Sequence, residues 1–243
     1  MELKLTLSDF DLTESNLSWV NEKTLIIRKW NWEYGLAHQF QKQAVKLVHE
    51  HAGLKILITT SHPHVLTNGR GLQKPRKGEE LTLVDFKPEN YPHLPYPLHQ
   101  IERGGGLTFH HPGQFIFYPI TRLNPQGLSL SKMTDEIFDY SIEVLSSWGV
   151  KDLGHENKLL GLWWRNEKKM ASMGIAIEKL VTFHGMALNL YLDPQMKTAL
   201  SILNPCGLSS DIYISAQELI TLPENALDKF CDEFLEKVIN GWL

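Results

Sequence analysis

Residues 161–190 read GLWWRNEKKMASMGIAIEKLVTFHGMALNL, and their pattern is the clearest indication of how the main sheet is built. It begins with an apolar arm at residues 162–164, followed by a polar turn at residues 165–167 and a return arm from Lys169. Two arms joined by a short polar turn are typical of a β-hairpin. Residues 181–190 form a further apolar run and predict a third strand. Hairpins, rather than strand–helix–strand units, therefore organise this region, which favours antiparallel pairing.

The rest of the chain supplies further strands and several helices. Short apolar or β-like runs predict strands at residues 24–28, 54–59 and 115–120. Apolar residues at helical spacing predict helices at residues 34–49, 133–148 and 224–240, the second of them ended by Gly149. The predicted fold class is α/β of the α+β type, a mixed, largely antiparallel sheet packed with helices. No internal repeat or low-complexity linker interrupts the sequence.

One long segment, residues 68–97, is polar and rich in proline. Segments of this kind are typical of long surface loops, so we expect a loop over this range. It contains Lys74, Arg76 and Lys77, which could form a local basic patch for an acidic partner. A charge run of this size is more commonly just solvated.

Composition narrows the class of protein. The chain has 243 residues, of which 42% are hydrophobic and 21% charged, as in ordinary soluble proteins. A net charge of −4 gives no basic field for nucleic acid, and the apolar runs are too short to span a bilayer. The first residues do not resemble a secretory signal, and two cysteines suit a reducing compartment. We expect a cytoplasmic protein that binds neither nucleic acid nor membranes.

The candidate nucleophile is Cys206, in the segment Asn204-Pro205-Cys206-Gly207. Proline limits the backbone on one side and glycine frees it on the other, so such a turn can present a thiol with little bulk around it. The other cysteine, Cys231, lies at helical spacing with Phe234 and Val238, on an expected core-facing stripe. We interpret Cys231 as structural. The alternative for Cys206 is a buried thiol that acts as a small hydrophobe.

Lys169 is the only charged residue on its predicted strand face. Alternation places it with Ala171, Met173, Ile175 and Ile177. The spacing alone favours a lysine at the strand end whose ammonium reaches solvent. The functional alternative is a partly desolvated amine that pairs with a thiolate or acts as a base.

A glycine-rich segment, RGGGLTFHHPGQ at residues 103–114, is the second candidate for ligand binding. Three glycines let a ligand approach the backbone, and Arg103 could bond a carbonyl, phosphate or carboxylate. The segment lacks the Gly-Lys-Ser/Thr of a phosphate loop and the third glycine of a dinucleotide fingerprint. A bulge beside a buried strand is the structural alternative.

The chain has eleven histidines, so metal binding has to be considered. His62 and His64 would share one strand face and could chelate a metal, but no third ligand accompanies them at a diagnostic spacing. We therefore predict no metal site. His184, followed by Gly185, could carry a proton or bind a ligand, although a lone strand histidine is more often a structural donor.

Four motifs, in order along the chain, resemble those of the octanoyltransferases of lipoate biosynthesis. Residues 103–114 resemble the family's RGGxxTYHGPGQ, with Phe109 in place of the tyrosine and His111 in place of the glycine that follows the histidine. Residues 169–174 (KMASMG) and 183–189 (FHGMALN) resemble its KIASIG and YHGLALN. Residues 204–207 match its NPCG. Weaker matches are residues 67–70 and, upstream, Tyr34, Ala37 and Gln41.

This resemblance implies a single domain, residues 1–243, with the fold of biotin and lipoate protein ligases. It implies Cys206 as the acyl-thioester nucleophile and Lys169 as its activating partner. It also implies an acyl pocket drawn from three segments: Arg103, Gly104, Gly105, Gly106, Leu107, Thr108, Phe109 and His110; Ser172, Met173 and Gly174; His184, Gly185, Met186 and Ala187.

The implied reaction moves an octanoyl group from octanoyl-acyl carrier protein, through a Cys206 thioester, to a lysine of lipoyl domains. Those acceptors would be the 2-oxoacid dehydrogenase complexes and the glycine cleavage protein. No metal or nucleotide cofactor is implied, and a monomer is expected. The alternatives are an ATP-dependent lipoate–protein ligase, which has no need of Cys206, an amidotransferase, whose cysteine is usually placed differently, and a non-enzymatic metal-binding protein.

Overall fold

The computed structural model describes residues 6–71, 95–124, 126–155, 160–203 and 210–242. An eight-stranded sheet has the order β1-β2-β3-β7-β11-β10-β9-β8. In that order its strands are Leu17–Asn21, Thr24–Lys29, Lys55–Thr60, Gln114–Ile120, Val181–Asn189, Lys168–Glu178, Gly161–Trp164 and Leu153–Gly154. Only β2 and β3 pair in parallel; the other neighbours are antiparallel. The predicted mixed, largely antiparallel sheet is confirmed.

The hairpin predicted from residues 161–177 is β9 and β10, in which Trp164 pairs with Lys168. Arg165 and Asn166 form its turn with φ values of 50° and 58°. Left-handed residues at the turn match the twist of the flanking strands, and asparagine tolerates that conformation well.

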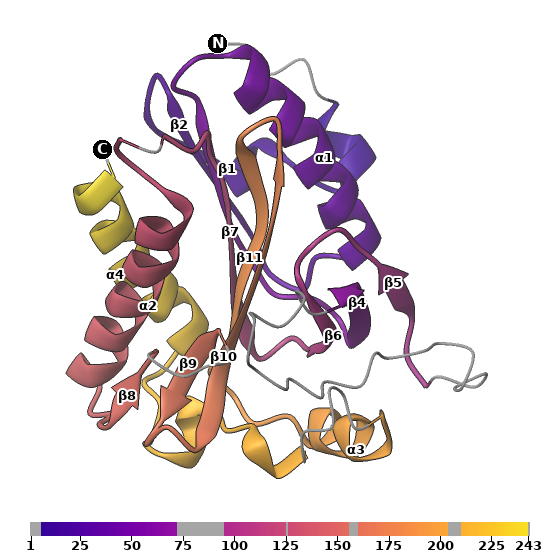
Figure 1. Cartoon of the computed structure of the whole chain (residues 1–243), viewed down its shortest axis with the longest axis vertical. Coiled ribbons are helices and arrows are strands. Elements are labelled where there is room, and N and C mark those ends of the chain that lie inside the picture. The colour runs from indigo at the N-terminus through magenta and orange to yellow at the C-terminus, as the bar shows by residue number, and fades with distance from the viewer. Residues whose placement is uncertain (1–5, 72–94, 125, 156–159, 204–209, 243) are drawn as a thin grey trace, which may run out of the picture.

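Helices cover both faces of the large sheet (Figure 1). Helix α1, Tyr34–Glu50, lies on one face, while α2, Leu130–Ser147, and α4, Ala226–Trp242, lie on the other. All three occupy the ranges predicted from sequence to within two or three residues. Gly149 follows α2 with φ 105° and donates its N–H to Ser146, which confirms the predicted helix end. Among the described residues, no helix combines the length and apolar character needed to cross a membrane.

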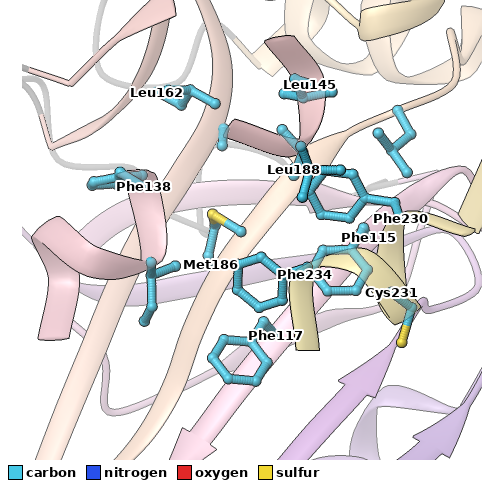
Figure 2. Packing of buried hydrophobic residues seen from close by; sticks show 14 of the residues in the cluster. Phe115, Phe117, Phe138, Leu145, Leu162, Met186, Leu188, Phe230, Cys231 and Phe234 are labelled. Carbon is cyan, nitrogen blue, oxygen red and sulfur yellow. The ribbon is translucent and has the colours of Figure 1, made fainter. Parts of the chain in front are cut away.

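Strand β7 shows why the apolar run at residues 115–120 is continuous. Phe115 and Phe117 point to the side of α4, while Ile116 and Tyr118 point to the side of α1. A strand covered on both faces needs apolar side chains at consecutive positions. Figure 2 shows the rings of Phe115, Phe117 and Phe230 gathered with Phe234, and edge contacts at centroid distances of 4.8 to 5.3 Å join them.

A second, three-stranded sheet has the order β5-β4-β6, with strands Leu98–Gln100, Val65–Gly71 and Gly105–His110. Helix α3, Pro194–Leu203, covers it through Met196 and Leu200, which pack with Phe109. Residues 68–71 belong to β4, so the prediction that the loop starts at residue 68 is wrong. Their polar side chains suggested a loop, but the prolines, which remove ladder hydrogen bonds, begin only at Pro75. The loop predicted over residues 72–94 lies outside the described residues.

Cys231 lies in the core beside Phe234 and is fully buried, as predicted (Figure 2). Burial raises the pKa of its thiol to about 11. A protonated thiol without solvent access reacts slowly with alkylating agents.

We therefore expect iodoacetamide to leave Cys231 unmodified in the native protein. The Cys206→Ala variant should gain no carbamidomethyl group under native conditions and one after denaturation, measured by intact mass. Rapid native labelling of that variant would show that the packing around Cys231 is wrong.

Candidate active site

Cys206 lies in residues 204–209, outside the described residues, so its relation to Lys169 stays a prediction. The residues on either side of that segment belong to described elements. Helix α3 ends at Leu203, and the chain resumes at Ser210. Tyr213 then pairs in parallel with Lys169, and the N–H of Ile214 donates to the Lys169 carbonyl oxygen at 3.1 Å. The chain that follows the cysteine segment is therefore held against the start of β10 by backbone pairing.

A β-bulge determines the direction of Lys169. The register of β10 against β9 shifts between Lys169 and Ala171, and Met170 and Ala171 both enter the core. The prediction that Lys169 shares the face of Ala171 and Met173 is therefore wrong, because one extra residue reverses the alternation. A Cβ on Gly161, which pairs with Ser172, would lie 2.6 Å from Lys169 Cε. Lys169 thus shares the face of Ser172.

The lysine side chain lies over Trp163, with Nζ 5.6 Å from the ring centroid. Both side chains come from the β9–β10 hairpin, where Trp163 and Lys169 are directly paired. Gly161 provides the space for the aliphatic stem, since any side chain there would meet it. The hairpin therefore holds an amine at the edge of the face that also carries Ser172 and Gly174.

A pocket opens between β6, β10 and β11, and most of the predicted acyl-pocket residues line it. Its lining residues are Tyr34, Arg103, Thr108, His110, Tyr118, Ser172, Met173, Gly174, His184, Gly185, Met186 and Ala187. Gly104, Gly105, Gly106, Leu107 and Phe109 do not line it. Leu107 and Phe109 instead pack against α3, since alternate residues of β6 point to opposite faces.

Two glycines of the pocket wall face each other across β10 and β11. Gly174 pairs with Gly185. A Cβ on Gly174 would lie 2.8 Å from Arg103 Cδ, and one on Gly185 would lie 2.1 Å from the Phe117 carbonyl oxygen. Neither position can take a side chain without movement of its neighbours, so the sequence keeps this part of the wall flat.

Arg103 ties the glycine-rich segment to β4. It is buried, and its guanidinium donates to the Thr67 carbonyl oxygen at 3.0 Å, to Thr67 Oγ1 at 2.9 Å and to Thr108 Oγ1 at 2.8 Å. Gly69 allows the close approach, because a Cβ there would lie 2.2 Å from the Gly105 carbonyl oxygen. Arg103 thus shapes the pocket wall as well as lining it.

His184 is held in an unusual backbone conformation. Its φ is 58°, in the left-handed region, and its backbone N–H donates to Gln41 Oε1 at 2.8 Å. Such a conformation persists when the surroundings fix it, and it is common at functional sites. Burial lowers the pKa of His184 to about 4, so the imidazole is neutral near pH 7. A neutral imidazole can donate or accept one hydrogen bond in the pocket.

Two tyrosines of the pocket wall were not predicted as site residues. Tyr34 is the first residue of α1, and its ring stacks on His110 at 5.8 Å. Tyr118 comes from β7 and bonds His62 Nε2 at 2.9 Å. Tyr34 is one of the weaker family matches, whereas Tyr118 lies in an apolar run that carries no functional signal. Burial raises the pKa of both hydroxyl groups, which keeps them protonated.

The prediction that His62 and His64 share a strand face is wrong. They lie in the connection between β3 and β4, where alternation does not apply. His62 is buried and donates from Nδ1 to the Trp32 carbonyl oxygen at 2.6 Å. His64 Nε2 instead bonds Asp193 Oδ2 at 2.8 Å. The two imidazoles have separate partners and do not form a chelating pair.

His111, which replaces a family glycine, is buried and lies outside the pocket lining. Its Nδ1 accepts the N–H of Gly113 at 3.2 Å and lies 3.8 Å from Asp193 Oδ2. Burial lowers its pKa to about 4, although Asp193 opposes this shift. The substitution therefore changes the β6–β7 turn rather than the acyl-pocket wall.

A second pocket adjoins the first through Thr108, Ser172 and Ala187. Its other lining residues are Phe109, Gln114, Asn189, Met196, Leu200 and Tyr213. It therefore extends from the sheet toward α3 and toward the residue that pairs with Lys169. Together the two pockets form a path of mixed polar and apolar lining, which runs from the paired glycines to α3 and Tyr213.

Comparisons with known proteins agree on the class of fold. Two solved structures align with the chain at a TM-score of 0.62 and 12% identity, covering 89% of this chain and 85% of each. One is a lipoate-protein ligase A bound with ATP, and the other is a putative lipoate protein ligase from T. acidophilum with bound lipoic acid. At this identity the similarity shows the fold alone, and the predicted ligase-like fold is confirmed.

The sequence comparisons define the family. A family model described as the lipoyl protein ligase A/B catalytic domain matches residues 33–235, and the chain belongs to this family. An octanoyltransferase from Syntrophobacter fumaroxidans is 34% identical over 165 residues, which cover 68% of this chain and 67% of the relative. An octanoyltransferase from Nostoc sp. is 31% identical over 186 residues, covering 76% and 77%. The predicted octanoyltransferase activity is therefore confirmed, and the cysteine–lysine mechanism is the step that still needs a test.

Proposed function

We propose that the chain transfers an octanoyl group from octanoyl-acyl carrier protein to a lysine of a lipoyl domain, through a thioester on Cys206. The observation that carries this proposal is the double pocket, which runs from Gly174 and Gly185 to α3 and Tyr213. Near α3 this path is lined by the apolar side chains of Phe109, Met196 and Leu200, which suit an acyl chain. The same end adjoins Tyr213, the pairing partner of Lys169.

The first step exchanges one thioester for another. The Cys206 thiolate attacks the acyl carbonyl carbon, the tetrahedral intermediate collapses, and the carrier's thiolate leaves. A free cysteine is mostly protonated at neutral pH, so the thiolate has to be stabilised. The Lys169 ammonium beside the sulfur would supply that stabilisation and lower the thiol pKa. Because a thioester replaces a thioester, the acyl group stays activated.

The second step forms the amide. The acceptor amine attacks the octanoyl-Cys206 carbonyl carbon, and the Cys206 thiolate leaves. The amine must lose a proton, and Lys169 in its neutral form would accept it. The oxyanion would be stabilised by backbone N–H groups near Gly174 or Gly185, or by the neutral imidazole of His184. Gly174, His184 and Gly185 all line the first pocket.

We also propose the acceptors, the compartment, the oligomeric state and the domain organisation that the resemblance implies. The acceptors are lipoyl domains of 2-oxoacid dehydrogenase complexes and of the glycine cleavage protein. The protein acts in the cytoplasm as a monomer with a single domain over residues 1–243, and transfer requires no metal or nucleotide cofactor.

A donor comparison tests the transferase against the ligase. The purified protein is mixed with a lipoyl domain and either octanoyl-acyl carrier protein or free octanoate plus ATP, and the mass of the lipoyl domain is measured. We expect modification with the carrier-bound donor in the absence of ATP. Modification only with octanoate and ATP, with ATP consumed, would identify a ligase instead.

The role of Lys169 gives a separate prediction. Lys169→Ala should slow transfer on the order of 100-fold, since it removes both the charge that stabilises the thiolate and the base. The pH midpoint of Cys206 alkylation should rise by about one unit or more. Lys168→Ala is the matched control, because the Lys168 ammonium donates instead to the Asp211 carbonyl oxygen. An alkylation profile that is the same in Lys169→Ala and wild type would contradict the pairing.

A further inference from the structure

Three potential metal ligands from distant parts of the sequence converge beside the pocket. His38 comes from α1, Glu102 precedes β6, and His184 comes from β11. Each offers one ligand atom, and the three atoms all lie within 4.8 Å of one another. No other group of three such ligands lies this close together among the described residues.

The buried imidazole of His184 points to a missing ligand. Its side chain is 2% exposed, and its Nε2 atom has no hydrogen-bond partner. The nearest carboxylate oxygen, Glu102 Oε2, is 3.7 Å away, which is too long for a hydrogen bond. The ring of His184 also stacks on the ring of His38, with 5.2 Å between their centroids. A buried polar atom left without a partner needs an explanation.

The spacing of the three atoms suits a small divalent ion. Tetrahedral Zn²⁺ with bonds near 2.0–2.1 Å would hold its ligand atoms about 3.3 Å apart. His38 Nε2 lies 2.8 Å from Glu102 Oε2, and His184 Nε2 lies 3.7 Å from the same oxygen. Shifts of less than about 1 Å at these side chains would bring both pairs to that spacing.

The surroundings fix the carboxylate in a suitable orientation. Lys42 Nζ bonds the other carboxylate oxygen, Glu102 Oε1, at 2.8 Å. That contact leaves Oε2 for the two imidazoles, as outer hydrogen bonds commonly do for ligating carboxylates. Glu178 lies 3.7 Å from the same ammonium and offsets part of its positive charge. The cluster therefore keeps one carboxylate charge available to a cation.

We propose that His38, Glu102 and His184 form a binding site for one divalent transition metal ion of the Zn²⁺ class. Two imidazoles and one carboxylate are a ligand set that such ions accept, and three protein ligands leave a fourth position open. His184 also lines the pocket between β10 and β11. The open position of the ion would therefore lie near the pocket. A bound ion would engage the imidazole of His184, which otherwise lines the pocket without a metal.

Calorimetry with zinc chloride on the chelator-treated, full-length protein tests the proposal. The Cys206→Ser variant serves as the background, because a free thiol also binds zinc. We expect one ion per chain, with an affinity lowered at least tenfold by His38→Ala and by Glu102→Gln. Replacement of zinc by Co²⁺ should give visible absorption bands typical of nitrogen and oxygen ligands, and these bands should be lost in both variants.

Matched controls separate this site from other histidines. His51→Ala removes an exposed imidazole just beyond α1, and His64→Ala removes the partner of Asp193. Both should bind zinc as the background does, and thermal melts should show that every variant is folded. The proposal is overturned if the background binds no zinc, if folded His38→Ala and Glu102→Gln bind it unchanged, or if His64→Ala alone abolishes binding.

Discussion

Replacing Cys206 with alanine is expected to abolish octanoyl transfer, by at least about 1,000-fold, because covalent catalysis loses its nucleophile. The lipoyl domain should gain no octanoyl mass when octanoyl-acyl carrier protein and the variant are incubated together. The loss should appear at every pH, since no other group on the pocket path carries a thiol: Cys231 is fully buried in the core between the sheet and α4.

Cys231→Ala is the matched control for this experiment. It removes the other thiol of the chain, and its removal from the core should change stability rather than transfer. Thermal melts of both variants separate loss of fold from loss of chemistry. Substantial transfer by folded Cys206→Ala would contradict the covalent mechanism and would favour the ATP-dependent ligase instead.

Mild acid is expected to unfold the protein. His62, His110, His111 and His184 are each at most 5% exposed. Burial lowers the pKa of His62, His111 and His184 to about 4, and that of His110 well below its usual value. In the unfolded chain each imidazole returns to a pKa near 6.5. Below that pH the unfolded chain binds protons that the folded chain does not, so stability falls as the pH drops toward 4.

The expected size of this effect is large. Between pH 7 and pH 5 the four histidines together should lower the free energy of unfolding by roughly 7 kcal/mol, at about 1.4 kcal/mol per proton and pH unit. That is comparable with the whole stability of many domains. Carboxyl groups with ordinary pKa values near 4 are still mostly ionised at pH 5, so the histidines dominate this range. Urea unfolding at a series of pH values measures the slope.

The geometry of His62 explains why its neutral form is preferred and offers a control. Its Nδ1 donates to the Trp32 carbonyl oxygen and its Nε2 accepts the Tyr118 hydroxyl, so the neutral ring is fully bonded. His62→Gln should reduce the pH slope by about one proton, whereas the exposed His51→Asn should leave it unchanged. A free energy of unfolding that is constant from pH 7 to pH 5 would contradict this account of the buried histidines.

The sheet and its helices could be predicted because their patterns are local. Phe115 and Ile116 point to opposite faces, both covered by helices, so the strand is apolar at every position. The turn at Arg165 and Asn166 likewise gave the β9–β10 hairpin. By contrast, the first strand of the small sheet, β4, ends in polar residues whose pairing with β6 comes from a distant segment. Composition alone could not separate them from a loop.

The site was predicted in part for the same reason. Motif order identified Ser172, Gly174 and Gly185, and the pairing of β10 with β11 brings them to one pocket. The direction of Lys169 was missed because a single-residue bulge is invisible to strand alternation. Tyr118 was missed because one position in an apolar strand carries no functional signal. His38 and Glu102 come together only through the tertiary fold, so their spacing in the sequence gave no indication of a cluster.

The thioester on Cys206 can be detected from the intact mass of the protein after incubation with octanoyl-acyl carrier protein alone. We expect a single octanoyl adduct on wild type, none on Cys206→Ala, and loss of the adduct when a lipoyl domain is added. The adduct should map to Cys206 by peptide sequencing. A lipoyl domain that is octanoylated while wild type never carries an adduct, or an adduct that persists in Cys206→Ala, would contradict the proposed thioester intermediate.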